Sequence, residues 1–116
     1  MNKKISFGFL LILFLFNQNL SAQTQAEMNQ TAKKDFELVD AELNKVYKEV
    51  IKLLSEKEKQ LLIKAQRDWI KFRDSHCEFE ANEYEGGSIQ PLIYSSCLTE
   101  RTKDRIKDLK SILEPK

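Results

Sequence analysis

The chain has 116 residues with 19 Lys and Arg against 18 Asp and Glu, so its formal net charge is only +1. This even balance excludes the strongly basic surface on which nucleic-acid binding depends. Two cysteines, one histidine, three glycines and two prolines are too few for a paired zinc motif or for the many turns of a sheet protein.

The first 22 residues have the layout of a secretory signal peptide. Lys3 and Lys4 precede an apolar run over residues 7–16, and polar residues then lead to a small residue at Ala22. The run is shorter than the roughly 20 apolar residues that cross a bilayer. We expect cleavage after Ala22 and a periplasmic or secreted product, residues 23–116, with no membrane anchor. A retained anchor is the alternative. No cysteine follows the cut, which argues against lipid attachment.

A first helix is predicted from about Gln25 to Leu54. Thr24 and Glu27 have the spacing of a capping box, in which the two residues satisfy each other's free backbone donors. Apolar residues then recur at steps of three and four, which is the period of a buried helix face. They are Ala32, Phe36, Val39, Leu43, Val46, Val50 and Leu53.

A second helix is predicted to begin after Ser55, which forms another capping box with Glu58. We expect it to end near residues 83–85, because Gly86 and Gly87 follow and glycine favours helix ends. Its predicted buried stripe comprises Leu62, Ala65, Trp69, Phe72, His76 and Phe79.

A third helix is predicted after Ser88, which can cap it, with Pro91 tolerated in the first turn. Small polar residues dilute its stripe, so a kink or break near Cys97 stays open, and Pro115 ends the ordered chain. The stripe comprises Leu92, Thr99, Thr102, Ile106, Leu109 and Leu113.

Three amphipathic helices joined by short turns pack most simply as an all-α, up-down-up three-helix bundle in a single domain, residues 23–116. A continuous coiled coil is the alternative, and the two turn signals disfavour it. Folding back around Ser55 sets Leu43 opposite Trp69, so we expect Trp69 at the centre of the core.

The two cysteines suit a disulfide between the second and third helices. Cys77 and Cys97 each lie ten residues from Gly87, so two antiparallel helices that fold back there bring them level. A disulfide needs Cα atoms within about 7 Å and the oxidising conditions met by exported proteins. Closing this loop should stabilise the fold by roughly 3 kcal/mol. Two free buried thiols are the alternative.

Candidate chemistry in the chain is sparse. His76 and Cys77 are neighbours in a helix and do not face each other, and a disulfide would consume the thiol. The carboxylates of the second helix, such as Asp68 and Glu78, have basic residues nearby and suit a solvated face. Without a phosphate loop or a nucleophile motif, the sequence predicts no catalytic residue, no metal and no cofactor.

The turn between the second and third helices is the candidate contact site for a protein partner. A tyrosine, two acids and small residues would protrude from a base fixed by the disulfide, which limits the entropy lost on binding. The alternative is an ordinary connection. The residues are Glu83, Tyr84, Glu85, Gly86, Gly87 and Ser88.

Several motifs together resemble the lysozyme inhibitor LprI-like domain family. They are residues 65–74 (AQRDWIKFRD), Cys77, the Gly86-Gly87-Ser88 turn, Cys97, residues 24–29 (TQAEMN) and residues 43–47 (LNKVY). The resemblance spans about residues 24 to 113. It implies a small helical bacterial protein outside the cytoplasm, in a family named for lipoproteins that inhibit lysozyme.

One departure from the family pattern concerns cysteines. The family commonly carries a further cysteine pair flanking the TQAEMN segment, and here Thr31 stands at the later position while no cysteine lies between Ala22 and Thr31. The resemblance carries over Trp69 as a core residue, and Arg73 and Asp74 as a charged network that fixes helix packing.

The sequence therefore favours a binding protein over an enzyme. A lysozyme is the partner implied by the resemblance, being a cationic protein with carboxylates in its cleft. Glu83 and Glu85 would steer it, and Tyr84 with the Gly86–Ser88 turn would make the contact. A structural or interaction module of the bacterial envelope is the second hypothesis. An enzyme that uses a carboxylate pair on cell-wall material is the least favoured.

Overall fold

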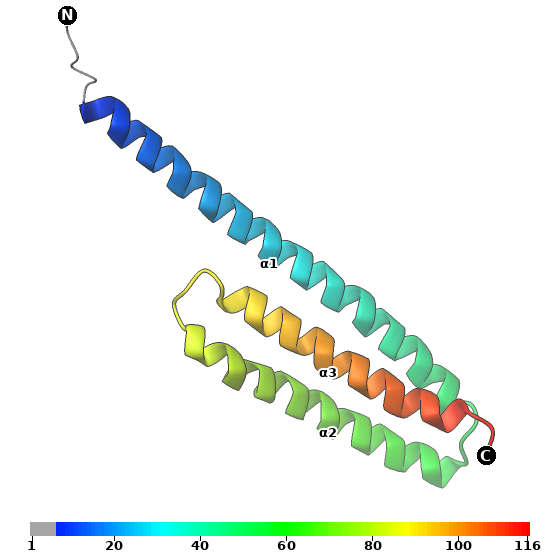
Figure 1. Cartoon of the computed structure of the whole chain (residues 1–116). Helices are drawn as coiled ribbons and strands as arrows, with labels where there is room; N and C mark the ends of the chain where they lie inside the picture. The colour runs from blue at the N-terminus through cyan, green and yellow to red at the C-terminus, as the bar shows by residue number, and fades with distance from the viewer. Residues whose placement is uncertain (1–6) are drawn as a thin grey trace, which may run out of the picture.

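The computed structural model describes the backbone of residues 7–116 and the side chains of residues 24–116. Three helices follow one another: α1 (Phe7–Ile51), α2 (Glu56–Ala81) and α3 (Gln90–Leu113), with a 3₁₀ turn, η1 (Asn82–Tyr84), after α2. In Figure 1, α2 and α3 form an antiparallel hairpin, and α1 runs along α3 and continues past the closed end of the hairpin. No strand occurs in residues 7–116. The predicted all-α three-helix fold is confirmed.

The predicted signal peptide, residues 1–22, lies outside the part of the chain whose side chains are described, so its cleavage stays a prediction. Within the described residues, no helix has the length and apolar character needed to cross a membrane.

The junction of α1 and α2 is where the sequence places a turn. The Ser55 hydroxyl accepts from the Glu58 amide, and the Glu58 carboxylate accepts from the Ser55 amide at 3.0 Å. These bonds hold the pKa of Glu58 below its usual value. The first predicted capping box is wrong, because α1 runs unbroken through Thr24. Leu53 follows the end of α1 and is 66% exposed, so its predicted burial is also wrong.

The main core lies where α1 and α3 pack together. Its buried members are Leu43, Val46, Val50, Ile106 and Leu109. Trp69 packs against this cluster from α2 but is only partly buried, so it borders the core and is not its centre. Burial of the α1 stripe follows the predicted steps of three and four from Ala32 to Val50.

The buried face of α2 differs from the predicted stripe. The residues that α2 buries are Gln66, Arg73, Cys77 and Ala81, whereas Phe72 is 60% and Phe79 is 76% exposed. The prediction that Ala65, Phe72 and Phe79 face the core is therefore wrong. Cys77 must face α3 to form its disulfide, and Phe79 follows it by two residues, which turns Phe79 about 200° away around the helix axis.

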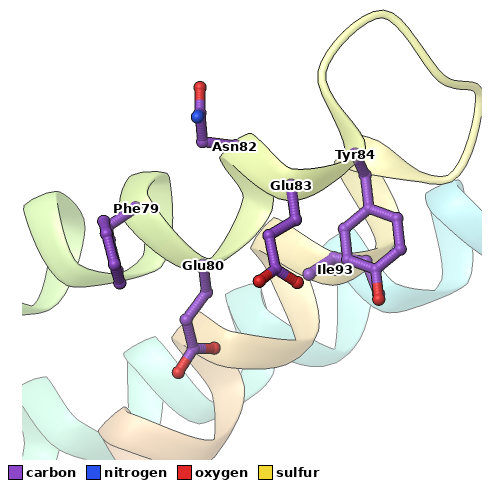
Figure 2. Close-up of a pocket in the computed structure, with 6 residues that line it drawn as sticks. All are labelled: Phe79, Glu80, Asn82, Glu83, Tyr84 and Ile93. Carbon is purple, nitrogen blue, oxygen red and sulfur yellow. The ribbon is translucent and has the colours of Figure 1, made fainter.

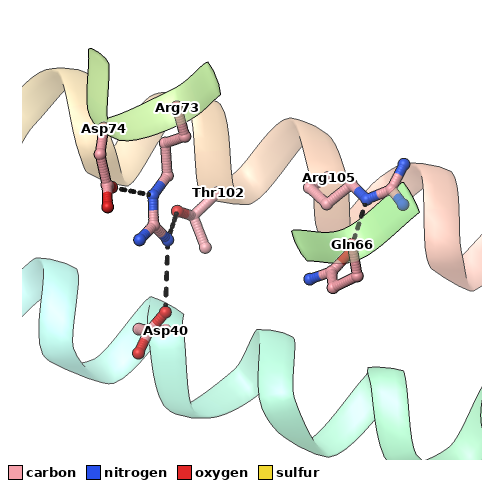
Figure 3. A network of polar contacts seen from close by, with 6 residues as sticks. All are labelled: Asp40, Gln66, Arg73, Asp74, Thr102 and Arg105. Atoms are coloured by element: carbon pink, nitrogen blue, oxygen red, sulfur yellow. Dashed lines mark hydrogen bonds and ion pairs between the residues drawn. The ribbon is translucent and has the colours of Figure 1, made fainter. Parts of the chain in front are cut away.

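Arg73 is a buried charged residue at the point where the three helices meet. Its Nε donates to Asp74 at 2.9 Å, and its Nη1 donates to Asp40 of α1 at 3.4 Å and to Thr102 of α3 at 3.3 Å. Figure 3 shows the guanidinium held between the ribbons. A buried arginine with these partners ties all three helices together.

Aromatic rings flank the same guanidinium. The Arg73 guanidinium carbon lies 5.1 Å from the Phe36 ring centre and 5.3 Å from that of Trp69. Arg105 of α3 lies 5.8 Å from the Trp69 ring and donates to Gln66 at 2.9 Å. Trp69 therefore lies within cation–π distance of two arginines, an arrangement that favours arginine over lysine.

The ends of the hairpin helices lie close to the predicted positions. The α-helical part of α2 ends at Ala81, and η1 extends the helical path to Tyr84. Ile89 is the N-cap of α3 and makes no side-chain cap, so the prediction of Ser88 as a cap is wrong. Pro91 lies in the first turn as predicted, and α3 runs through Cys97 without a break.

Candidate partner-binding site

A disulfide joins α2 and α3 near the turn that connects them. Cys77 and Cys97 are bonded, with their Cα atoms 5.6 Å apart, which confirms the pairing predicted from their equal spacing to Gly87. Both cysteines are buried together with Leu98, and Phe36 and Tyr94 pack against them. The bond therefore lies inside a small apolar cluster that also includes α1.

Tyr94 links this cluster to the acidic side of the hairpin. Burial raises the pKa of its phenol, and the nearby Asp74 and Glu78 carboxylates raise it further, since each disfavours the phenolate. Tyr94 is therefore a neutral hydroxyl over the whole physiological range.

The turn at the closed end of the hairpin is built from short backbone bonds. The Glu85 amide donates to Asn82, the Gly87 amide donates to Tyr84 at 2.9 Å, and the Gln90 amide donates to Gly87. In the described part of the chain, the amides of Gly86 and Ser88 donate to no backbone carbonyl.

The turn is also anchored to α1. The Asn29 side chain donates to the Ser88 carbonyl at 2.9 Å, and Gln25 donates to Asn29 at 2.9 Å. Residues 83–88 are all exposed. The turn is nevertheless attached to the rest of the fold, by the disulfide that joins its two flanking helices and by the hydrogen bond from Asn29 of α1.

Gly86 provides a test of this turn. Its φ is +77°, a left-handed conformation that costs a residue with a side chain about 1–2 kcal/mol. We expect Gly86→Ala to lower the melting temperature by about 5 °C in thermal unfolding followed by circular dichroism. Gly86→Asn should lose less, because asparagine tolerates this conformation better. Equal stability of all three proteins would contradict the assigned turn geometry.

A surface hollow of about 390 Å³ lies beside the turn. Its lining residues come from the end of α2, from η1 and from α3, and they are Phe79, Glu80, Asn82, Glu83, Tyr84 and Ile93. In Figure 2, Glu80, Glu83 and Tyr84 direct their polar ends to the same side, whereas the Asn82 side chain points away. The hollow thus combines exposed aromatic rings with two carboxylates.

Acidic and basic residues are unevenly distributed along the second half of the sequence. Residues 74–100 contain six carboxylates and no lysine or arginine, whereas residues 101–116 contain six basic and three acidic residues. The six acids are Asp74, Glu78, Glu80, Glu83, Glu85 and Glu100. The segment that holds both cysteines and the turn is therefore acidic on a chain whose total charge is close to zero, although Arg73 pairs with Asp74 and Arg101 lies 3.8 Å from Glu80.

His76 and Glu80 lie next to the disulfide. His76 Nε2 and Glu80 Oε1 are 2.9 Å apart, Arg101 approaches the same carboxylate at 3.8 Å, and the Cys97 sulfur lies within 4.8 Å. Because that sulfur is bonded to Cys77, it offers no thiolate. The remaining histidine and carboxylate fall short of the four ligands of a structural zinc site.

The structure brings together more residues than the sequence predicted. The predicted set, residues 83–88, forms one exposed turn, while the hollow adds Phe79, Glu80, Asn82 and Ile93. The stretch from Asp74 to Glu100, which lacks any lysine or arginine, could have been found in the sequence. Ile93 could not, because only the fold-back of α3 along α2 brings it to the same hollow.

A protein-family model described as lysozyme inhibitor LprI matches residues 17–109. This chain belongs to the lysozyme inhibitor LprI family. The match covers α2, η1, the turn, both cysteines and nearly all of α3. The LprI family is described by inhibition and not by a catalysed reaction, which points to a protein partner.

An uncharacterized protein of Rhizobium meliloti (strain 1021) is 38% identical over 106 residues, covering 80% of this chain and 76% of that protein. No solved structure matches the chain. Membership of the LprI family is therefore shown by sequence similarity and not by a structural match.

Proposed function

We propose that this protein is a lysozyme inhibitor of the bacterial envelope or its surroundings, and that it binds lysozyme through the closed end of the α2–α3 hairpin. Family membership supports the partner. The observation that carries the choice of surface is the acidic stretch from residue 74 to residue 100, which has no lysine or arginine. A location outside the cytoplasm agrees with the disulfide, which persists in oxidising compartments.

Electrostatic attraction is the first step of the proposed mechanism. A cationic lysozyme is drawn to the acidic closed end of the hairpin, because complementary charge raises the association rate. Glu83 and Glu85 are exposed to solvent at the turn, and neither has an ion-pair partner among the described residues. Their charge is therefore available to a partner.

Insertion of the turn is the second step. Tyr84 is 40% exposed and presents a ring of the type enriched at energetically dominant contacts. The backbone amides of Gly86 and Ser88 and the Ser88 hydroxyl supply donors for the carboxylates in the cleft, which do the acid and nucleophile chemistry of a lysozyme. Occupying those carboxylates would block substrate without any chemistry by the inhibitor.

The test is a lysozyme activity assay with the purified protein and with Tyr84→Ala/Ser88→Ala. We expect inhibition by the unaltered protein and a loss of potency of about tenfold or more in the variant, as for a dominant contact residue. Absence of inhibition at micromolar protein, across several lysozyme types, would reject the function. Unchanged potency of the variant would reject the turn as the contact.

Variants with neutralised carboxylates distinguish electrostatic steering of lysozyme from direct contact with it. Glu83→Gln/Glu85→Gln should slow association and weaken its salt dependence, with a smaller effect on dissociation. Glu37→Gln/Glu49→Gln removes two exposed carboxylates from α1 and leaves the hairpin unchanged, so it is the matched control. Equal association rates for the two double variants would contradict steering by the hairpin.

A further inference from the structure

One face of α2 carries an apolar stripe that no other part of the described chain covers. Leu61, Ala65, Phe72 and Phe79 follow one another at steps of four, seven and seven, so they lie along one side of the helix. All four are exposed, Leu61 and Phe72 by 60% each and Phe79 by 76%. From Leu61 to Phe79 the stripe extends over about 27 Å.

Neither α1 nor α3 packs against this face of α2. Cys77 faces α3, and Arg73 faces α1 and α3, so the packed side of α2 lies opposite the stripe. His76 stacks on Phe72 of the stripe, with ring centres 5.5 Å apart. Asp68 interrupts this face between Ala65 and Phe72, but three large exposed apolar side chains aligned along one helix still indicate an interaction surface.

The charges beside the stripe differ between its two ends. Residues 56–71 contain five basic and three acidic residues, whereas residues 74–85 contain five acidic residues and no lysine or arginine. Two parallel α2 helices would place acidic ends together. Two antiparallel helices would place each acidic end beside the more basic end of the other, so the charge pattern favours pairing with a second copy in the opposite direction.

We propose that α2 pairs with α2 of a second copy of this chain, antiparallel, to form a homodimer. Leu61 of each copy then packs against Phe79 of the other, and the two Phe72 rings meet near the two-fold axis. The more basic first half of α2 in each copy then lies beside the acidic second half of the other. This self-complementary arrangement is what a two-fold dimer requires.

Sedimentation analysis of the purified protein tests the dimer. At a concentration of about 100 µM we expect dimer for the unaltered protein, and Phe72→Glu should raise the dimer dissociation constant by about tenfold or more. Leu38→Glu is the matched control, because Leu38 is 72% exposed on α1, away from α2, and should leave the dimer intact. Raising the salt concentration should weaken the dimer, since charge pairs flank the stripe.

The orientation has its own readout. A spin label at Gln60→Cys would lie level with residue 80 of the other copy, so antiparallel pairing places the two labels about 30 Å apart along the axis. Labels in close contact would overturn the antiparallel arrangement. A monomer at this concentration, or equal dissociation constants for Phe72→Glu and Leu38→Glu, would overturn the dimer.

Experiments can reject the proposed dimer and the proposed lysozyme contact independently of each other. A monomer whose inhibition is lost in Phe72→Glu would assign the stripe to the lysozyme partner and overturn the dimer. A dimer that dissociates in Phe72→Glu, but inhibits no lysozyme, would support the dimer while rejecting the proposed function.

Discussion

Replacing Cys77 and Cys97 together by alanine is expected to lower the free energy of unfolding by about 3 kcal/mol. The two residues are 20 positions apart in sequence, so the bond closes a loop whose freedom in the unfolded chain is then restored. It is the one disulfide that the chain can form, because the sequence has no other cysteine. A domain of this size commonly has a total stability of only about 5–15 kcal/mol, so the loss is a large fraction.

Denaturant unfolding of the unaltered protein and the double variant measures this effect. The unaltered protein in a reducing agent should approach the stability of the variant, which separates loss of the bond from loss of the sulfur atoms. With only two cysteines in the chain, no exchange within the molecule obscures the result. A change in unfolding free energy below about 1 kcal/mol would contradict the assigned contribution of the disulfide.

The second large effect is expected at Arg73. Its side chain is only 8% exposed, and Arg73→Ala removes the contacts to both carboxylates, to Thr102 and to the rings of Phe36 and Trp69. Because Asp40 and Asp74 are themselves 39% and 42% exposed, solvent weakens the charge contribution, and lost packing is the larger part. We expect a destabilisation of about 2–3 kcal/mol.

Two further variants divide the Arg73 contribution into packing and charge. Arg73→Met retains most of the side-chain volume and should lose less stability than Arg73→Ala. Lys64→Ala is the control, because it removes the exposed Lys64–Asp68 pair and should change stability by less than about 0.5 kcal/mol. Equal, small losses in Arg73→Ala and Lys64→Ala, measured by denaturant unfolding, would contradict the role of Arg73 in helix packing.

Those parts of the fold that depend on local signals were predictable from the sequence. The Ser55–Glu58 capping box marks the start of α2, and the regular apolar steps from Ala32 to Val50 identify the buried face of α1. The disulfide followed from symmetry about Gly87. Each of these features is set by residues close in sequence or by one simple fold-back.

The buried face of α2 was not predictable from apolar periodicity alone. Two polar residues, Gln66 and Arg73, are buried there because Arg105, Asp40 and Thr102 provide partners from other helices. Their burial displaces Phe72 and Phe79 to the surface. The position of Cys77 contained the missing information, since a helix that turns Cys77 toward α3 cannot also turn Phe79 inward.

The candidate site was predicted in part. The turn, residues 83–88, is exposed as expected, but the adjoining hollow needs Ile93 from α3 beside Tyr84. The net charge of the whole chain concealed the acidic stretch from Asp74 to Glu100, because basic residues elsewhere compensate for it. Charge counted along the sequence, segment by segment, would have identified it.

Hydrogen exchange of the protein with and without lysozyme is the most direct test of the proposed binding surface. We expect slower exchange on complex formation across residues 79–89, which span the end of α2, η1 and the turn, and unchanged exchange at the α1–α2 junction around Ser55. No protection at residues 79–89 in a complex that inhibits lysozyme, or protection confined to the Ser55 junction, would contradict binding through the closed end of the hairpin.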